Sequence, residues 1–426
     1  MRDAILGSLC LAAAVSLLAA PLSAAGVPDQ PTFHRDVEPI LQEHCQSCHR
    51  PKPLNMSGMI APFALTAYDD ARPWAKAIAK AVEARIMPPW GASEKFHGVF
   101  RNERSLSTDE ISTLVRWAQT GAAAGDAADA PAPRQFQDAE WWLGQPDLVV
   151  KLPEPVWVGD DVKDWQPNIF VELSGDQLPE DRYIRAVECK PGSDRGVHHV
   201  VINTMEPGEG GTLAEATGKL IGGLAPGDEP SMTHDGYGML LKRGTTLRVN
   251  MHYNKEPGPG TGFYDQTAIG FFFYPKGAEV RETISAPVGI FDFEIPPGKK
   301  DWTIGMAQTF ERPFTLLAML PHTHVRGVAA EYVAYFPDGR VEQLLDVPRY
   351  DYNWQISYEY PEPRHFPAGT RIEVRMVYDN STENPSNPDP TQAVRFGLET
   401  QQEMALGWML WSWDDEVPAA ATGGGQ

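Results

Sequence analysis

The chain has 426 residues, too many for one hydrophobic core, so its length indicates roughly two to four domains. Its formal net charge is −21, from 36 basic and 57 acidic side chains. This balance argues against nucleic acid and anionic membrane surfaces as partners, and it favours a basic redox partner.

The N-terminal segment, residues 1–25, is predicted to be a secretory signal peptide. Arg2 begins a short basic region, Ala4 to Ala20 is apolar, and small residues follow, so cleavage is expected near residue 24 or 25. Lipoprotein attachment at Cys10 is disfavoured because the residue before it is large. No other stretch approaches the ~18 apolar residues that span a bilayer. We therefore expect a periplasmic or secreted protein with no membrane span.

Residues 31–125 show helical periodicity around one cysteine motif. Apolar residues recur on one helix face before this motif, which reads Cys45-Gln46-Ser47-Cys48-His49. Two thiols at this spacing can add to two haem vinyl groups, and the histidine that follows can ligate the iron. A disulfide or a zinc site is the alternative, which the lack of a second cysteine pair disfavours. We expect one covalent haem c held by Cys45, Cys48 and His49.

The sixth iron ligand is expected from a later loop of the same region. A predicted helix over about 68–85 ends at Met87-Pro88-Pro89-Trp90, where the prolines stop the helix and stiffen a loop that can present a thioether. Met87 is the predicted ligand. The alternatives left open are Met56, Met59, His44 and His97. A capping box from Ser107 to Glu110 begins a last helix, and together these elements predict a small all-α cytochrome c domain over residues 31–125.

Residues 126–140 are the predicted linker, because they are rich in alanine, proline and aspartate without a sustained period. Short apolar runs then alternate with Pro-Gly turns, which is typical of antiparallel β structure. We place one jelly-roll-like sandwich at 141–285, a second at 286–416 and a disordered tail at 417–426. The predicted fold class is a small all-α cytochrome c domain followed by two all-β antiparallel sandwich domains.

Three histidines of the first predicted sandwich are candidate metal ligands. His198 and His199 begin an apolar run, and neighbouring side chains on a strand point to opposite faces. Both can bind one ion only where a bulge or a strand end turns one of them. His252, at the end of another apolar strand, is the third candidate. Three imidazoles without a thiolate favour copper or zinc.

The second predicted sandwich carries His322-Thr323-His324 directly after the apolar run Phe314 to Leu320. Two imidazoles separated by one residue on a strand project from the same face and can hold one metal ion. Met404 is the candidate third ligand, and a thioether beside two imidazoles favours copper, especially Cu(I). The alternative to a metal site is that both histidines simply lie on the polar face of a strand.

Three further side chains are interpreted without a ligand role. Cys189 is expected to be a small buried apolar residue. His234 and His365 are expected in solvated turns, where either could replace one of the chosen ligands. No disulfide is available within the sandwiches, since Cys189 is their one cysteine.

In these residues the chain resembles the copper type II, ascorbate-dependent monooxygenase family, to which peptidylglycine α-hydroxylating monooxygenase and dopamine β-monooxygenase belong. The resemblance rests on the order and local contexts of His198-His199, His252, His322-Thr323-His324 and Met404, and it covers about residues 141–413. The whole chain is similar to the bacterial form with a fused N-terminal cytochrome c domain. Animal members have several disulfides that this chain lacks, so its sandwiches must be held together by packing.

The resemblance implies a copper-dependent monooxygenase with two copper ions. His198, His199 and His252 would hold an electron-storing copper. His322, His324 and Met404 would hold the copper that meets dioxygen and hydroxylates a C–H bond of a small organic substrate. The fused haem c would relay electrons from a periplasmic donor, ascorbate or a redox protein, to the first copper.

Two other functions remain open from the sequence. One is a non-enzymatic periplasmic electron-transfer or copper-binding protein, and the other is a cytochrome-linked oxidoreductase without oxygen insertion. The residues by which the family grips its substrates do not transfer to this chain. The substrate is therefore not predicted.

Overall fold

The computed structural model describes residues 26–51, 60–136, 140–205 and 218–420. The predicted signal peptide and the alternative ligands Met56 and Met59 lie outside these ranges. Of the tail predicted from residue 417, the described part reaches residue 420, and Ala419 exchanges backbone hydrogen bonds with Val280. Within the described ranges no helix is long and apolar enough to cross a membrane.

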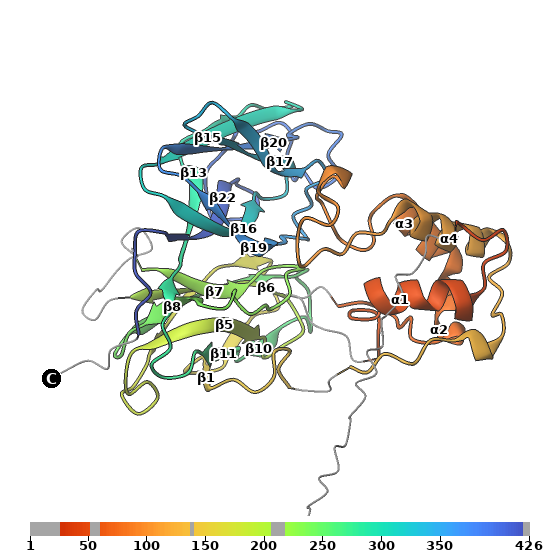
Figure 1. Cartoon of the computed structure of the whole chain (residues 1–426), viewed down its shortest axis with the longest axis horizontal. Coiled ribbons are helices and arrows are strands. Elements are labelled where there is room, and N and C mark those ends of the chain that lie inside the picture. The colour runs from red at the N-terminus through yellow and green to blue at the C-terminus, as the bar shows by residue number, and fades with distance from the viewer. Residues whose placement is uncertain (1–25, 52–59, 137–139, 206–217, 421–426) are drawn as a thin grey trace, which may run out of the picture.

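The prediction of an all-α cytochrome c domain is wrong. The chain is mostly β structure, and the α-helices that precede it are short and joined by irregular segments (Figure 1). They are α1 (Glu38–His44, 7 residues), α2 (Tyr68–Ala71, 4 residues), α3 (Ala75–Glu83, 9 residues) and α4 (Thr108–Gln119, 12 residues). The helix predicted over about 68–85 is broken by a 3₁₀ turn at Arg72–Trp74, which contains a proline. The Ser107–Glu110 capping box is present and begins α4.

Part of the predicted cytochrome segment packs on the second sandwich instead of closing a domain of its own. Trp90, Phe96 and Phe100 belong to the hydrophobic core of that sandwich. The backbone N–H of Ser93 donates to the carbonyl of Asp346 at 2.8 Å, which continues the contact along the polypeptide. A helical periodicity cannot reveal such a segment, because its partners come more than 200 residues later.

Trp90 gives a stability test of this packing. Its side chain is 7% exposed, so Trp90→Ala should lower the free energy of unfolding by about 3–5 kcal/mol, the usual cost of removing a buried aromatic ring. Urea unfolding followed by far-UV circular dichroism measures the change. Trp157, which is 50% exposed, is the control, and its replacement by alanine should cost less than about 1 kcal/mol. Equal costs would contradict the packing of residue 90 into the sandwich core.

The first sandwich has two main layers, which are antiparallel except for the parallel pair β8 and β12. One layer has the strand order β1-β11-β5-β8-β12, and the other has β3-β9-β6-β7 with β4 also paired to β9. Strands β5, β6 and β9 are the longest of this sandwich, with nine residues each, and all three contribute to its buried core. The strands are β1 (Leu148–Lys151), β2 (Val156–Val158), β3 (Asp164–Trp165), β4 (Asn168–Glu172), β5 (Arg182–Lys190), β6 (Val197–Met205), β7 (Leu220–Leu224), β8 (Tyr237–Leu241), β9 (Thr246–Asn254), β10 (Phe263–Asp265), β11 (Ala268–Phe273) and β12 (Arg281–Glu282).

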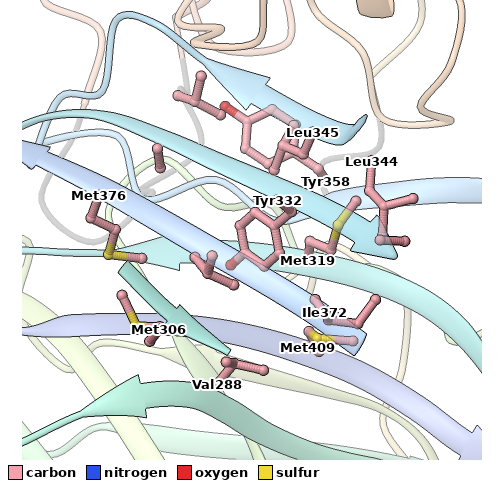
Figure 2. Packing of buried hydrophobic residues seen from close by; sticks show 14 of the residues in the cluster. Val288, Met306, Met319, Tyr332, Leu344, Leu345, Tyr358, Ile372, Met376 and Met409 are labelled. Carbon is pink, nitrogen blue, oxygen red and sulfur yellow. The ribbon is translucent and has the colours of Figure 1, made fainter. Parts of the chain in front are cut away.

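The second sandwich stacks two four-stranded antiparallel sheets, β13-β22-β16-β19 and β15-β20-β17-β18. Methionine, tyrosine and branched side chains from both sheets fill the space between them, as Figure 2 shows for Met319, Tyr332 and Met376. The strands are β13 (Ile284–Ile290), β14 (Glu294–Ile295), β15 (Trp302–Phe310), β16 (Phe314–His322), β17 (Gly327–Tyr335), β18 (Val341–Val347), β19 (Tyr358–Phe366), β20 (Thr370–Tyr378), β21 (Val394–Arg395) and β22 (Ala405–Trp413).

A loop of the first sandwich, residues 225–234, docks on the second. The carbonyl of Pro226 accepts the backbone N–H of Gln355 at 2.7 Å, and Asp228 accepts the N–H of Ser357 at 3.2 Å. Gly227 has φ +79°, and a Cβ there would lie 2.3 Å from the ring of Trp354. Only glycine satisfies both demands without strain. This loop therefore fixes how the two sandwiches face each other.

The docked loop makes folding stability depend on pH. Burial, with a further contribution from Glu359, raises the pKa of Asp228 to about 7. In the unfolded chain the same carboxyl loses its proton near about pH 4. Between about pH 4 and 7 the folded state therefore binds more protons than the unfolded state, so the free energy of unfolding falls as pH rises through that window. Asp228→Asn cannot ionise and should lose that slope. Its urea midpoint should therefore exceed that of the wild type by more at about pH 8 than at about pH 5. The exposed Asp194→Asn is the control, and parallel pH profiles for all three proteins would contradict the assignment.

Candidate metal centre

Three imidazoles of the first sandwich converge. His198 and His199 lie on β6, His252 lies on the neighbouring β9, and their ligand nitrogens all lie within 4.8 Å of one another. The Nδ1 atom of His199 is 3.3 Å from Nδ1 of His198 and 3.2 Å from Nδ1 of His252. The register between β6 and β9 shifts between Val197 and His199. This irregularity is what two adjacent residues need to face one point.

The donor set of this cluster fits a metal ion. Metal–nitrogen bonds of ~2.0–2.1 Å at a tetrahedral angle place ligand nitrogens ~3.3 Å apart, which matches the two Nδ1 distances. Burial and the neighbouring His252 lower the pKa of His198 to about 3, and the same causes lower the pKa of His199. Both rings are therefore neutral near pH 7, which is the form that binds metals.

Asp164 orients the third ring. Its Oδ1 is 3.1 Å from Nε2 of His252, so this contact occupies Nε2 and leaves Nδ1 directed at the cluster. Burial works against an ionised Asp164, but hydrogen bonds from His252, Thr400 and Asn254 outweigh it and lower its pKa to about 2. An anionic carboxylate behind an imidazole is a common arrangement around protein metal sites.

The second cluster uses the opposite ring nitrogens. Nδ1 of His322 lies 2.8 Å from Oε1 of Gln355, and Nδ1 of His324 lies 3.1 Å from the carbonyl of Gln402. Both partners are acceptors, so each Nδ1 carries the proton and each Nε2 keeps its lone pair. Burial lowers the pKa of His322 to about 4 and that of His324 to about 3, so both rings are neutral.

Glu403 connects His324 to the segment that carries Met404. It is 0% exposed, and its carboxylate accepts the backbone N–H of His324 at 2.8 Å and that of Arg326 at 2.7 Å. On the far side, Tyr378 donates its hydroxyl to the carbonyl of Met404 at 2.6 Å. The loop after β16 and the segment before β22 are therefore fixed to each other at the second cluster.

Both clusters open on one cavity of about 1000 Å³ between the sandwiches. His199 lines it from the first sandwich, and His322, His324 and Met404 line it from the second. The Tyr352 ring lies between the clusters: it stacks on His198 with centroids 4.9 Å apart and meets His324 edge-on at 5.8 Å. One ligand of the first cluster, His199, and the three predicted ligands of the second thus line the same cavity, although they come from two domains.

The structure does not bring all the predicted haem ligands together. Nδ1 of His49 is 3.1 Å from the carbonyl of Phe63, which leaves Nε2 free to ligate iron. Cys45 and Cys48 are free thiols, both partly exposed. Met87 lines a separate cavity of about 280 Å³ beside α3 and α4, and the cysteine motif lies outside that lining. The structure therefore does not bring Met87 and His49 to one cavity.

The remaining histidines have other partners. His44 pairs with Glu110 at 3.1 Å, and His97 pairs with Glu103 at 2.8 Å. His365 is exposed and pairs with Asp414. His234 is half-buried: its Nε2 lies 2.7 Å from the carbonyl of Tyr360, and the residue lines the large cavity. Cys189 is buried in the first core, as expected.

Comparisons with known proteins name no function. No family model and no curated protein matches the chain. Solved structures with some likeness include the major capsid protein P2 from Bacteriophage PM2 (7% identity, 63% of this chain and 98% of that chain, TM-score 0.24) and the infectious bursal disease virus VP2 subviral particle (12% identity, 66% and 74%, TM-score 0.18). A third is the STIV MCP (8% identity, 54% and 95%, TM-score 0.21). At such TM-scores the likenesses carry no argument, so the resemblance to copper monooxygenases rests on the residues alone.

Proposed function

We propose that the protein is an exported copper-dependent monooxygenase that hydroxylates a C–H bond of an organic substrate with dioxygen. The proposal is carried by one cavity, large enough for a substrate, that is lined by His199 of the converging first cluster and by His322, His324 and Met404. Copper bound at His198, His199 and His252 would store an electron, and copper at His322, His324 and Met404 would meet dioxygen and activate the C–H bond.

The protein residues around the clusters have definable roles. Asp164 contacts Nε2 of His252 and Gln355 contacts Nδ1 of His322, so each contact orients one ring and leaves its other nitrogen for a metal. Glu403 holds the loop of His324 against the segment of Met404.

The N-terminal segment is the proposed source of electrons. A haem c attached at Cys45, Cys48 and His49 would supply one-electron transfer. Ile86, Pro89 and Gly91, which follow α3, line a cavity of about 770 Å³ together with His198, so one cavity borders both this segment and the first cluster. A covalent tether also raises the effective concentration of donor at acceptor. In stopped-flow reduction, the reduced haem should transfer electrons to copper within one turnover, and a slower transfer would exclude the relay.

Metal analysis and isotopic oxygen test the enzyme proposal together. The purified holoprotein should contain about two copper ions per chain, because two separate ligand sets face the cavity. Labelled dioxygen should then appear in the hydroxyl group of a product when candidate C–H substrates are screened by oxygen uptake. Copper near zero or one per chain would instead favour an electron-transfer or copper-binding protein. Oxidised product without label would favour an oxidoreductase that inserts no oxygen.

A further inference from the structure

One cationic side chain of the large cavity lacks a partner that its position requires. Arg248 lines the cavity from β9, and its Nη2 donates to Oδ1 of Asn203 at 2.7 Å. Its Nε is buried and makes no hydrogen bond, and within the described ranges Arg248 forms no ion pair with a carboxylate. Leaving a donor of a charged group buried and unpaired is costly. Within the described ranges the Arg248 side chain makes one hydrogen bond, that of Nη2 to Asn203, so the guanidinium that lines the cavity keeps Nη donors for a ligand.

The strand register places this cation at a defined distance from the first cluster. His199 pairs with His252, Val201 with Asn250, and Asn203 with Arg248 along β6 and β9. Residues two apart on a strand share a face, so His252, Asn250 and Arg248 follow one another on the same wall. Four residues at ~3.3 Å each separate Arg248 from His252 by ~13 Å along the strand.

The opposite wall is apolar over a comparable stretch. Along β16 and β22 His322 pairs with Leu406, Leu320 with Trp408, and Ala318 with Leu410, and all of them line the cavity. This row begins at a ligand of the second cluster and contains no charged residue; the nearest carboxylate on the same sheet that lines the cavity is Glu359 of β19, which pairs with Ala318 at the far end of the row. A ligand that fills the cavity therefore meets an aliphatic and aromatic surface along its body.

We propose that the cavity binds an amphipathic carboxylate whose anionic head pairs with Arg248 and whose aliphatic body lies along the apolar wall toward the two histidine clusters. A carboxylate supplies the acceptors that the Arg248 guanidinium lacks, because the planar fork of arginine matches the two oxygens. That the carboxylate is the substrate rests on the proposed monooxygenase function. That the cavity binds a carboxylate does not. In the enzyme, the position hydroxylated would be remote from the carboxylate.

Binding of decanoate to the metal-free full-length protein tests the proposal. Isothermal titration calorimetry below the micelle concentration should show saturable binding of decanoate, with weaker binding of 1-decanol and none of acetate. Arg248→Met should weaken decanoate binding by about tenfold to a hundredfold, because a charge-assisted pair is lost, and leave decanol binding unchanged. Arg248→Lys should restore part of the loss. Arg243→Met, which removes an exposed arginine in the turn just before the same strand, is the matched control and should bind decanoate like the wild type.

Each contrary outcome has one meaning. Equal binding of decanoate and decanol by the wild type would overturn the proposal without any variant, so it stays testable even if Arg248→Met fails to fold. Decanoate bound equally by Arg248→Met and the wild type would overturn it too. Because the titration needs no metal, it tests the carboxylate site separately from the copper proposal. If the protein took up no copper but bound decanoate through Arg248, the monooxygenase proposal would fail and the carboxylate site would stand.

Discussion

Met404→Ala is expected to abolish hydroxylation while the first cluster keeps its copper. Met404 contributes the thioether of the second ligand set, and it lines the cavity beside His322 and His324. Substitution of a residue that hydrogen-bonds to a metal ligand typically costs about 10- to 100-fold in metal affinity or activity. Loss of a ligand itself should therefore reduce product formation by more than about 100-fold. The first cluster shares no ligand with Met404, so copper content should fall from about two to about one per chain.

Copper analysis, electron paramagnetic resonance of the oxidised protein and product assay measure the three parts of this expectation. Met239→Ala is the matched control, because Met239 lines the same cavity from β8 of the first sandwich and belongs to neither cluster. Full activity in Met404→Ala would remove the thioether from the proposed site. Loss of both coppers would show that the residue holds the fold and not one ligand set.

The sequence predicted those features that depend on strand periodicity. The alternation rule indicated that His322 and His324 share a face, and both line the cavity. The same rule required an irregularity at His198 and His199, and the register shift between β6 and β9 lies there. Local patterns of this kind follow from side-chain direction and need no knowledge of distant partners.

The features that the sequence missed all depend on contacts between distant segments. Asp164 meets His252 across 88 positions and Glu403 meets the loop of His324 across 79, and neither carboxylate stands in a recognisable motif. The Trp90 segment was assigned to a helical domain because its partners in the second sandwich are remote. The Arg248 site could have been suspected from one signal, a charged residue that alternates with Asn250 and His252 in an otherwise apolar strand.

Glu403→Ala is expected to damage stability and the second cluster together. The carboxylate accepts the backbone N–H groups of His324 and Arg326, and it lies near the guanidinium of Arg326, which is 2% exposed. Alanine would leave these two buried donors without an acceptor, at about 1–3 kcal/mol each. The free energy of unfolding should therefore fall by about 2–6 kcal/mol.

The same change should release the second copper, because His324 and Met404 stand on the two segments that Glu403 joins. The free energy of unfolding, measured with urea, and the copper content should therefore fall together in Glu403→Ala, with copper near one per chain. Glu403→Gln keeps an acceptor oxygen, so its stability and copper content should fall less. Glu399→Ala, an exposed carboxylate of the same loop, is the control. A destabilised Glu403→Ala protein that still binds two coppers would mean that the ligands of the second cluster are positioned by the strand ends alone, and that the carboxylate serves only the fold.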